Sequence, residues 1–160
     1  RLPSLKFQTG ESAGNLFAAA LARQAALARG VAAHAEYERI EWLEEATNDL
    51  ERALMRPRDL TALWRERPFE VLADGEWTSG RFDRVVFTGT GAARRATVYD
   101  FKTNARRPQE SEADFARRMA ETYAGQMSAY RKALVALTGL RPEAVSCVLL
   151  LTSTNASVAL

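Results

Sequence analysis

The sequence predicts an α/β (α+β) domain with a central mixed β-sheet that contains an antiparallel hairpin and is flanked by helices. Residues 80–87 and 98–103 alternate in polarity with the period of two that is typical of strands. The glycine-containing segment 88–95 between them has the length of a hairpin connection. Residues 115–137 carry apolar side chains at spacings of three and four, which predicts a long helix against the sheet.

Length and composition indicate one soluble domain. The chain has 160 residues, 47% of them apolar and 26% charged, as in ordinary soluble proteins. The net charge of +2 is too small to imply a nucleic-acid partner by itself. Arginine outnumbers lysine, which suits bidentate phosphate contacts, although a GC-rich genome is the favoured explanation.

Cys147 is the single cysteine of the chain, which excludes an internal disulfide and any four-cysteine zinc or iron–sulfur site built by this chain alone. No stretch is apolar for long enough to span a membrane, and no signal peptide opens the sequence, so a cytoplasmic protein is expected. The chain starts at Arg1 and stops within a predicted strand. We therefore expect a fragment of a longer polypeptide.

The N-terminal third is predicted to be helical. Residues 1–14 lack periodicity and are expected to form a linker or a surface strap. Residues 15–28 are rich in alanine and leucine, and residues 31–43 are expected to continue as helix. A third, amphipathic helix is predicted over 44–55, and residues 59–64 are expected to add one helical turn. The predicted division is 1–14 linker-like, 15–56 N-terminal helices and 66–160 core.

The core elements follow in order. Residues 66–72 enter the sheet, residues 74–76 form a turn, and residues 77–87 and 96–103 are the next two strands. Residues 144–152 form an apolar run that is typical of a central strand.

A basic loop and a long helix lie between the last two predicted strands. The loop covers residues 104–109. Ser111 and Asp114 have the spacing of a capping box that begins the helix, and Gly139 is expected to end it.

Charged side chains interrupt the apolar pattern of the hairpin. Asp100 and Lys102 lie on one face of their strand, and Tyr99 and Phe101 point the other way into a core. A neighbouring antiparallel strand offers Asp83. Two adjacent carboxylates repel each other unless a cation lies between them, and oxygen ligands suit Mg²⁺ or Mn²⁺ better than zinc. The ammonium of Lys102 can lower the pKa of a metal-bound water or hold a phosphate oxygen.

The pattern Asp83 followed by Asp100-x-Lys102 resembles the PD-(D/E)XK nuclease superfamily. The longer sequence motifs of residues 80–85 and 99–103 are similar to those of its RecB-like branch, the nuclease domain that is fused to helicases of the RecB and AddA type. Three further matches stand in the expected order: Gly30-x-x-x-His34, residues 65–69, and Gln126-x-x-x-Tyr130. The resemblance covers residues 29–151 and implies a restriction-endonuclease-like core.

The resemblance implies a metal-dependent DNA nuclease that hydrolyses phosphodiester bonds, with exonuclease-type processing of DNA ends for recombination and repair. It implies Mg²⁺, or Mn²⁺, held by His34, Asp83, Asp100 and a backbone carbonyl near Phe101. Lys102 would position or deprotonate the attacking water. Some relatives hold an iron–sulfur cluster through cysteines, which this sequence cannot do.

The same resemblance assigns Gln126 and Tyr130 to the border of the active site and to DNA contacts. From the residues alone, a polar pair on an inward helix face could equally be core packing with a satisfied amide. For Arg106 and Arg107, a solvated loop and a role in holding phosphates of a single strand are equally favoured. The resemblance implies DNA as a partner, either single-stranded or at a duplex end. It also implies a helicase domain in the same chain and allows for a second subunit.

Several charged residues have a simpler reading. A lone helical histidine is more often structural, and the resemblance is what favours a ligand role for His34. Glu38 is expected to pair on the helix surface or to orient His34. For Glu66, a salt bridge to a neighbouring arginine is favoured over a role near the site. Arg84 points away from Asp83 and is expected to pair with a carboxylate.

Two other functions remain open from the sequence. One is a catalytically inactive, nuclease-like DNA-binding or scaffold domain of a helicase, although the intact set of Asp83, Asp100 and Lys102 argues against it. The other is metal-dependent hydrolysis of a substrate other than DNA.

Overall fold

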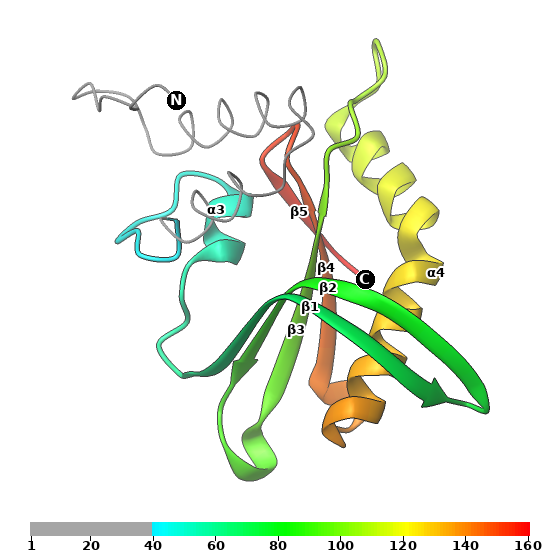
Figure 1. The fold of residues 1–160 in the computed structure, drawn as a ribbon. Coiled ribbons are helices and arrows are strands. Elements are labelled where there is room, and N and C mark those ends of the chain that lie inside the picture. The colour runs from blue at the N-terminus through cyan, green and yellow to red at the C-terminus, as the bar shows by residue number, and fades with distance from the viewer. Residues whose placement is uncertain (1–39) are drawn as a thin grey trace, which may run out of the picture.

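A computed structural model describes residues 40–160, and the predictions for residues 1–39, including His34 and Glu38, lie outside this range (Figure 1). The described part is a five-stranded sheet with helices on both faces. Its elements are α3 (Asp49–Leu54), β1 (Leu60–Ala73), β2 (Glu76–Thr88), β3 (Arg95–Lys102), α4 (Glu112–Thr138), β4 (Val145–Leu151) and β5 (Ala156–Ala159), with 3₁₀ turns η1 (Gly91–Ala93) and η2 (Pro142–Ala144).

The sheet has the strand order β1-β2-β3-β4-β5 and is mixed, as predicted. β1–β2, β2–β3 and β4–β5 pair antiparallel, and β3–β4 pair parallel. A parallel pair needs a long crossover, which α4 supplies along one face of the sheet (Figure 1). No helix among residues 40–160 is long and apolar enough to cross a membrane.

The boundaries of α4 agree with the sequence signals. The Ser111 Oγ accepts a hydrogen bond from the Asp114 backbone N–H (3.0 Å), which satisfies one of the unpaired amides of the first turn. Gly139 ends the helix with φ 69°, in the left-handed region that glycine tolerates best.

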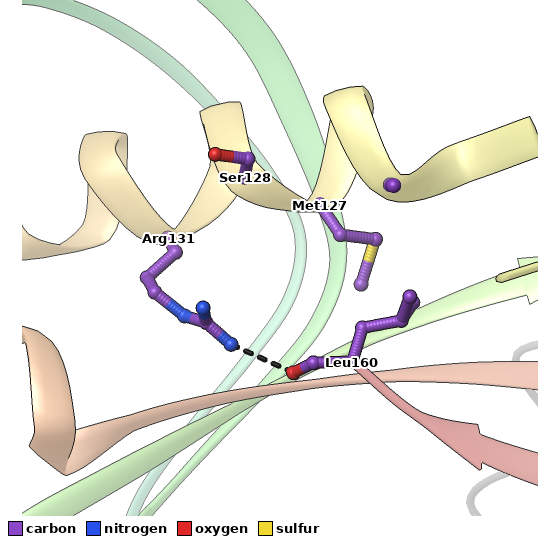
Figure 2. Close-up of a pocket in the computed structure, with 5 residues that line it drawn as sticks. Met127, Ser128, Arg131 and Leu160 are labelled. Carbon is purple, nitrogen blue, oxygen red and sulfur yellow. Dashed lines mark hydrogen bonds between the residues drawn. The ribbon is translucent and has the colours of Figure 1, made fainter. Parts of the chain in front are cut away.

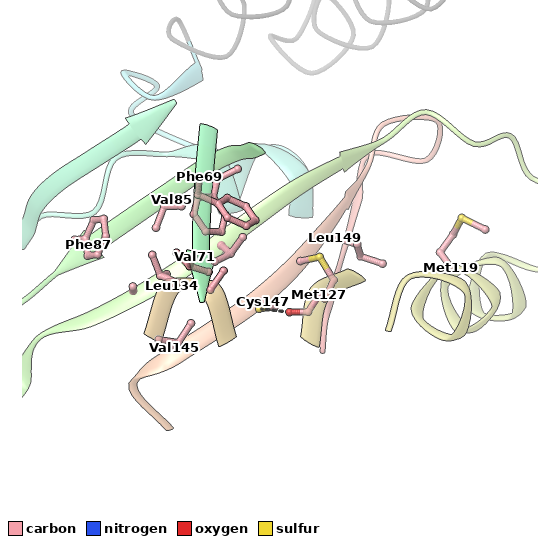
Figure 3. Packing of buried hydrophobic residues seen from close by; sticks show 14 of the residues in the cluster. Phe69, Val71, Val85, Phe87, Met119, Met127, Leu134, Val145, Cys147 and Leu149 are labelled. Atoms are coloured by element: carbon pink, nitrogen blue, oxygen red, sulfur yellow. Dashed lines mark hydrogen bonds between the residues drawn. The ribbon is translucent and has the colours of Figure 1, made fainter. Parts of the chain in front are cut away.

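The sheet buries a different cluster on each face. The main core joins α4 to one face, with Met119, Met127 and Leu134 of the helix among its members (Figure 3). The other face carries a smaller cluster of Ile40, Leu50, Leu54 and Leu150, against which Tyr99 and Phe101 pack. Tyr99 and Phe101 therefore point away from α4, as the alternation of β3 predicts.

Three local predictions in the N-terminal part are wrong. The helix expected to reach Leu43 ends at Ile40, with a turn after it. The helix expected over 44–55 is confined to Asp49–Leu54, because Asn48 caps its start by accepting the Glu51 backbone N–H (2.8 Å). The helical turn expected over 59–64 is strand β1, since long-range pairing with β2 overrides local propensity.

The β1–β2 hairpin changes its inward face halfway along. Ala62 and Trp64 pack on the main core from the first half of β1, and Phe69 and Val71 do so from the second half. The parity of the inward residues thus switches near Glu66, which has φ 45°. The ladder pairs of β1 and β2 do not include Glu66 and Asp83, although the register is the same on both sides of them.

Candidate active site

Asp100 and Lys102 lie side by side on the face of β3 that is turned toward α4. Their side chains are 4% and 13% exposed, and the Lys102 Nζ is 2.5 Å from the Asp100 Oδ2. The contact is an ion pair, in which the Lys102 ammonium compensates the charge of the buried Asp100 carboxylate. The predicted shared face is confirmed.

Two polar residues of α4 extend the arrangement. The Lys102 Nζ donates to the Gln126 Oε1 (2.9 Å), and the Gln126 Nε2 donates to the Tyr130 hydroxyl (2.9 Å) and lies 3.5 Å from the Asp100 Oδ1. The two residues thus face the charged strand, one turn apart on the inward side of the helix. The amide of Gln126 is fully engaged, as a polar group in this position must be.

Aromatic packing orients Tyr130. Its ring meets those of Phe69 and Phe82 edge-on, at centroid distances of 5.8 and 5.4 Å, and those two rings stack on each other at 4.4 Å. Gly80 permits this stack, because a Cβ there would lie 2.8 Å from the Phe69 ring. The outer half of the β1–β2 hairpin thereby fixes one side of the site.

Asp83 stands where β2 separates from β3. The last ladder pair is Arg84 with Tyr99, and one step beyond it the Asp83 Oδ2 accepts the Phe101 backbone N–H (2.9 Å). The carboxylate thus replaces a backbone carbonyl as the acceptor for that amide. The register carries Asp83 toward Asp100, and the two carboxylates interact electrostatically.

Burial shifts the acidities of the site. Desolvation, together with the charges of Asp100 and Glu66, raises the pKa of Asp83 to about 6, although the Phe101 amide and Lys102 oppose this. Desolvation also raises the pKa of Asp100, against the hydrogen bonding and charge of Lys102. The pKa of Tyr130 is raised, first by burial. Two adjacent acids with raised pKa values favour a bound cation that would stabilise both as carboxylates.

Residues 6–157 match the sequence model of the PD-(D/E)XK nuclease superfamily. The chain belongs to this superfamily. No curated protein sequence matches the chain. Members of the PD-(D/E)XK superfamily are typically nucleases that use divalent metal ions such as Mg²⁺. The restriction-endonuclease-like fold expected from the sequence is confirmed by the mixed sheet and its helices.

Asp83 and Asp100 fit the divalent ion of a PD-(D/E)XK nuclease. Asp100 is buried and Asp83 half-buried, the two charges interact, and carboxylate oxygens are ligands that Mg²⁺ prefers. Within residues 40–160, no three histidine, cysteine or acidic side chains gather closely enough to form a complete metal site. The predicted ligand His34 lies outside those residues, and the predicted role of the Phe101 carbonyl stays a prediction.

Two residues beside Lys102 were missed by the sequence reasoning. The Lys102 Nζ lies 3.9 Å from the centroid of the Tyr123 ring, and the Tyr123 hydroxyl donates to the Asn104 Oδ1 (3.0 Å). Tyr123 is three residues before Gln126 on the same helix face, and this spacing was the available signal. Nothing in the sequence pattern marks Asn104.

Charged neighbours of the site follow the simpler reading. Glu66 forms the expected arginine pair, with its Oε2 3.4 Å from the Arg81 Nη1, and its charge also reaches Asp83. Arg84 points to the opposite side of the sheet and binds the carboxylate of Glu41, as predicted for an arginine facing away from Asp83.

Arg106 and Arg107 lie on the loop after β3 rather than among the site side chains. Arg106 is 3.9 Å from Glu112 in an exposed pair. Both arginines line an open groove that the turn of residues 153–155 closes on its other side. From this groove the Ser153 Oγ donates to the backbone oxygen of Asn104 (2.7 Å), whose side chain accepts from Tyr123 beside Lys102.

A second pocket lies on another flank of α4 (Figure 2). It is lined by apolar groups, Ser128 and Arg131, whose Nη2 donates to the Leu160 backbone oxygen (2.7 Å). None of its lining residues is an acid or a histidine, so it lacks the ligands of a nuclease metal site.

Replacing Asp83 with asparagine is expected to stabilise the metal-free protein. A carboxyl whose folded pKa is raised from 3.8 to about 6 destabilises the fold once it ionises. The gain should be about 1–2 kcal/mol near neutral pH, allowing for partial solvation of the group, and should vanish as the pH falls from about 6 to about 4. Urea unfolding in EDTA at several pH values measures it. A loss of stability at neutral pH would contradict the expectation.

Proposed function

We propose that the chain is an Mg²⁺- or Mn²⁺-dependent deoxyribonuclease that hydrolyses phosphodiester bonds. The observation that carries the proposal is the meeting of Asp83, Asp100 and Lys102 at the point where β2 and β3 separate. Two buried acids and one amine at a common point suit a cation and a phosphate together.

In this proposal each residue has a separate task. Asp83 and Asp100 hold the divalent ion, with His34 and a carbonyl near Phe101 as further ligands. The ion supplies polarisation of the phosphate and a lowered pKa for the attacking water. Lys102 positions or deprotonates that water and offsets the charge that develops on the phosphate.

Gln126 and Tyr130 serve the substrate in the proposed reaction. In the ligand-free protein, the Gln126 amide joins Lys102 to Tyr130 at 2.9 Å on each side. A DNA backbone entering the site would exchange one of these contacts for a phosphate oxygen. Pre-formed donors of this kind reduce the cost of ordering the site on binding.

The groove beside Arg106 and Arg107 supports a single strand or a duplex end as the substrate. Phosphate contacts dominate sequence-independent DNA binding, and arginine is well suited to them. No base-reading element is evident in the sequence, so sequence specificity should be slight.

Exchanging Arg106 and Arg107 together for alanine is expected to raise KM for single-stranded DNA by about 3–30-fold with kcat nearly unchanged. Loss of two phosphate contacts should also reduce the salt slope of binding by about 1.5. The control is Arg141→Ala, an exposed arginine paired with Glu143 at the other end of β4. Equal effects of the two variants would remove the groove from the proposed substrate path.

The proposed setting is a helicase–nuclease that processes DNA ends in recombination and repair in the cytoplasm. This proposal depends on the similarity of the sequence motifs at residues 80–85 and 99–103 to those of the RecB-like branch. In this setting the 160 residues are one nuclease domain, and the same polypeptide carries helicase motifs. The domain binds DNA, and a second subunit can complete the assembly.

A cleavage assay tests the proposed activity. Single-stranded DNA, duplex DNA, RNA and a small phosphodiester are each incubated with Mg²⁺, with Mn²⁺ or with EDTA. Metal-dependent cleavage of DNA in preference to the others supports the proposal. Metal-independent DNA binding without cleavage would instead favour the scaffold alternative, and preferential cleavage of a non-DNA substrate would favour the other hydrolase.

A further inference from the structure

A buried ion-pair cluster lies behind the site, on the face of the sheet turned away from α4. Glu41 is 3% exposed, and its two carboxylate oxygens are shared between two arginines. Its Oε2 accepts from the Arg65 Nη2 (2.7 Å), and its Oε1 accepts from the Arg84 Nη1. Arg84, also 3% exposed, donates through its other terminal nitrogen to the Leu54 backbone oxygen (3.2 Å).

The two arginines are cross-strand partners on β1 and β2. Like charges directly opposite each other on a sheet repel, and the Glu41 carboxylate between them offsets this repulsion. Both arginines are sequence neighbours of Glu66 and Asp83: Arg65 comes before Glu66, and Arg84 comes after Asp83. Glu41 therefore joins both strands where the inward face of the hairpin changes.

Arg84, which holds the cluster to β2, is one peptide unit from Asp83. Successive side chains of a strand point to opposite faces, so fixing the Arg84 guanidinium on the far face limits rotation of β2 about its axis. Asp83 is the first residue beyond the β2–β3 ladder, and its side chain contacts β3 by accepting the Phe101 N–H. Asp83 therefore lies between two fixed neighbours, Phe82 in the main core on one side and Arg84, held by Glu41, on the other.

We propose that Glu41 is a positioning residue for the site: through Arg84 it fixes the section of β2 from which the Asp83 carboxylate reaches the Phe101 amide and the metal ion. The metal part of this inference rests on the proposed nuclease function. The part concerning Asp83 and Phe101 depends on the geometry of the ligand-free chain.

The test is Glu41→Gln in the full chain, followed by amide hydrogen exchange and by Mn²⁺ titration. The Phe101 amide should exchange at least about 5-fold faster, because the hydrogen bond from this amide to Asp83 should open more often. Amides within the β2–β3 ladder, such as that of Phe87, should exchange as in the wild type. The Mn²⁺ concentration for half-saturation should rise about 10-fold or more, as for other residues that orient metal ligands. DNA affinity measured in EDTA should stay within about 2-fold, because the phosphate contacts are untouched.

Two further variants keep the test decisive. Val145→Ala removes buried volume at the start of β4, far along the strand from the residue that pairs with Phe101. This destabilised control should leave the exchange of the Phe101 amide and Mn²⁺ binding unchanged. If Glu41→Gln does not fold, Arg84→Lys keeps the charge but cannot bind Glu41 and Leu54 in the same fork geometry, and it should show the same changes at smaller size.

A purely structural role for Glu41 predicts a different result. The melting temperature would then fall in Glu41→Gln as in Val145→Ala, with Phe101 exchange and Mn²⁺ half-saturation unchanged relative to that control, and the proposal would be overturned. Failure of the nuclease function would be recognised separately, since the wild-type chain would bind no Mn²⁺ and cleave no DNA. The Phe101 exchange would still decide whether Glu41 positions Asp83.

Discussion

Lys102→Ala is expected to lower kcat for DNA cleavage by about 10²–10⁴-fold, the range usual for loss of a group that moves a proton or stabilises charge in the transition state. The ammonium lies 2.5 Å from the Asp100 Oδ2, and it donates to Gln126 from a mostly buried position. Steady-state cleavage of single-stranded DNA in saturating Mg²⁺ measures the effect. DNA affinity should change far less, because the arginines of the proposed groove, Arg106 and Arg107, would still contact the DNA phosphates.

Controls for this substitution come from the chain itself. Lys132→Ala removes an exposed lysine that pairs with Asp74 on the hairpin turn, and it should cleave like the wild type. Lys102→Met keeps the aliphatic volume over the Tyr123 ring and separates loss of charge from loss of packing. Cleavage by Lys102→Met at the wild-type rate would remove Lys102 from the mechanism and leave Asp83 and Asp100 as an ion site without this amine.

Asp100→Asn should abolish metal-dependent cleavage, with a loss of at least about 10³-fold, because one of two charged ligands becomes a weaker neutral amide. Asp100 is 3% exposed and pairs with Lys102, so asparagine keeps the volume but removes one charge of a buried ion pair, and the folded state should lose some stability. Calorimetric titration of Mn²⁺ and cleavage measured over a wide range of Mg²⁺ concentrations are the two measurements.

The outcome separates ligand loss from a general defect. Asp74→Asn is the matched control, since Asp74 is exposed on the turn with φ 52°, a conformation that asparagine also adopts. It should bind Mn²⁺ and cleave DNA normally. Full Mn²⁺ affinity in Asp100→Asn would show that the ion is held elsewhere and would refute the proposed metal site.

The placement of the candidate site residues could be predicted because it depends on short periods. Asp100 and Lys102 are two residues apart on a strand, and Gln126 and Tyr130 are four apart on a helix, so each pair shares a face whatever surrounds it. Asp83 was predictable from the antiparallel register of a single hairpin connection. For these residues the structure adds distances and burial to a correct arrangement.

Several differences between the predictions and the structure involve contacts between distant segments. Leu60–Trp64 is a strand because β2 pairs with it, and strand β5 was not anticipated, although β4 supplies its partner residues. The buried cluster of Glu41 with Arg84 joins residues 43 positions apart. A single sequence contains no periodic signal for such contacts, and only the pairing expected for Arg84 followed from its strand face.

The change of inward face in the β1–β2 hairpin separates two requirements on the same pair of strands. Between the base of the hairpin and Glu66 and Asp83, the strands must keep the register that places the acid. Between these two residues and the turn, the strands pack Phe69 and Phe82 against Tyr130 and keep an apolar side toward α4. Lengthening the outer half by two residues on each strand preserves the pleat and moves only the turn at Asp74 and Gly75. Evolutionary insertions and deletions in this hairpin should therefore come in twos and gather at its tip, while the base keeps a constant length.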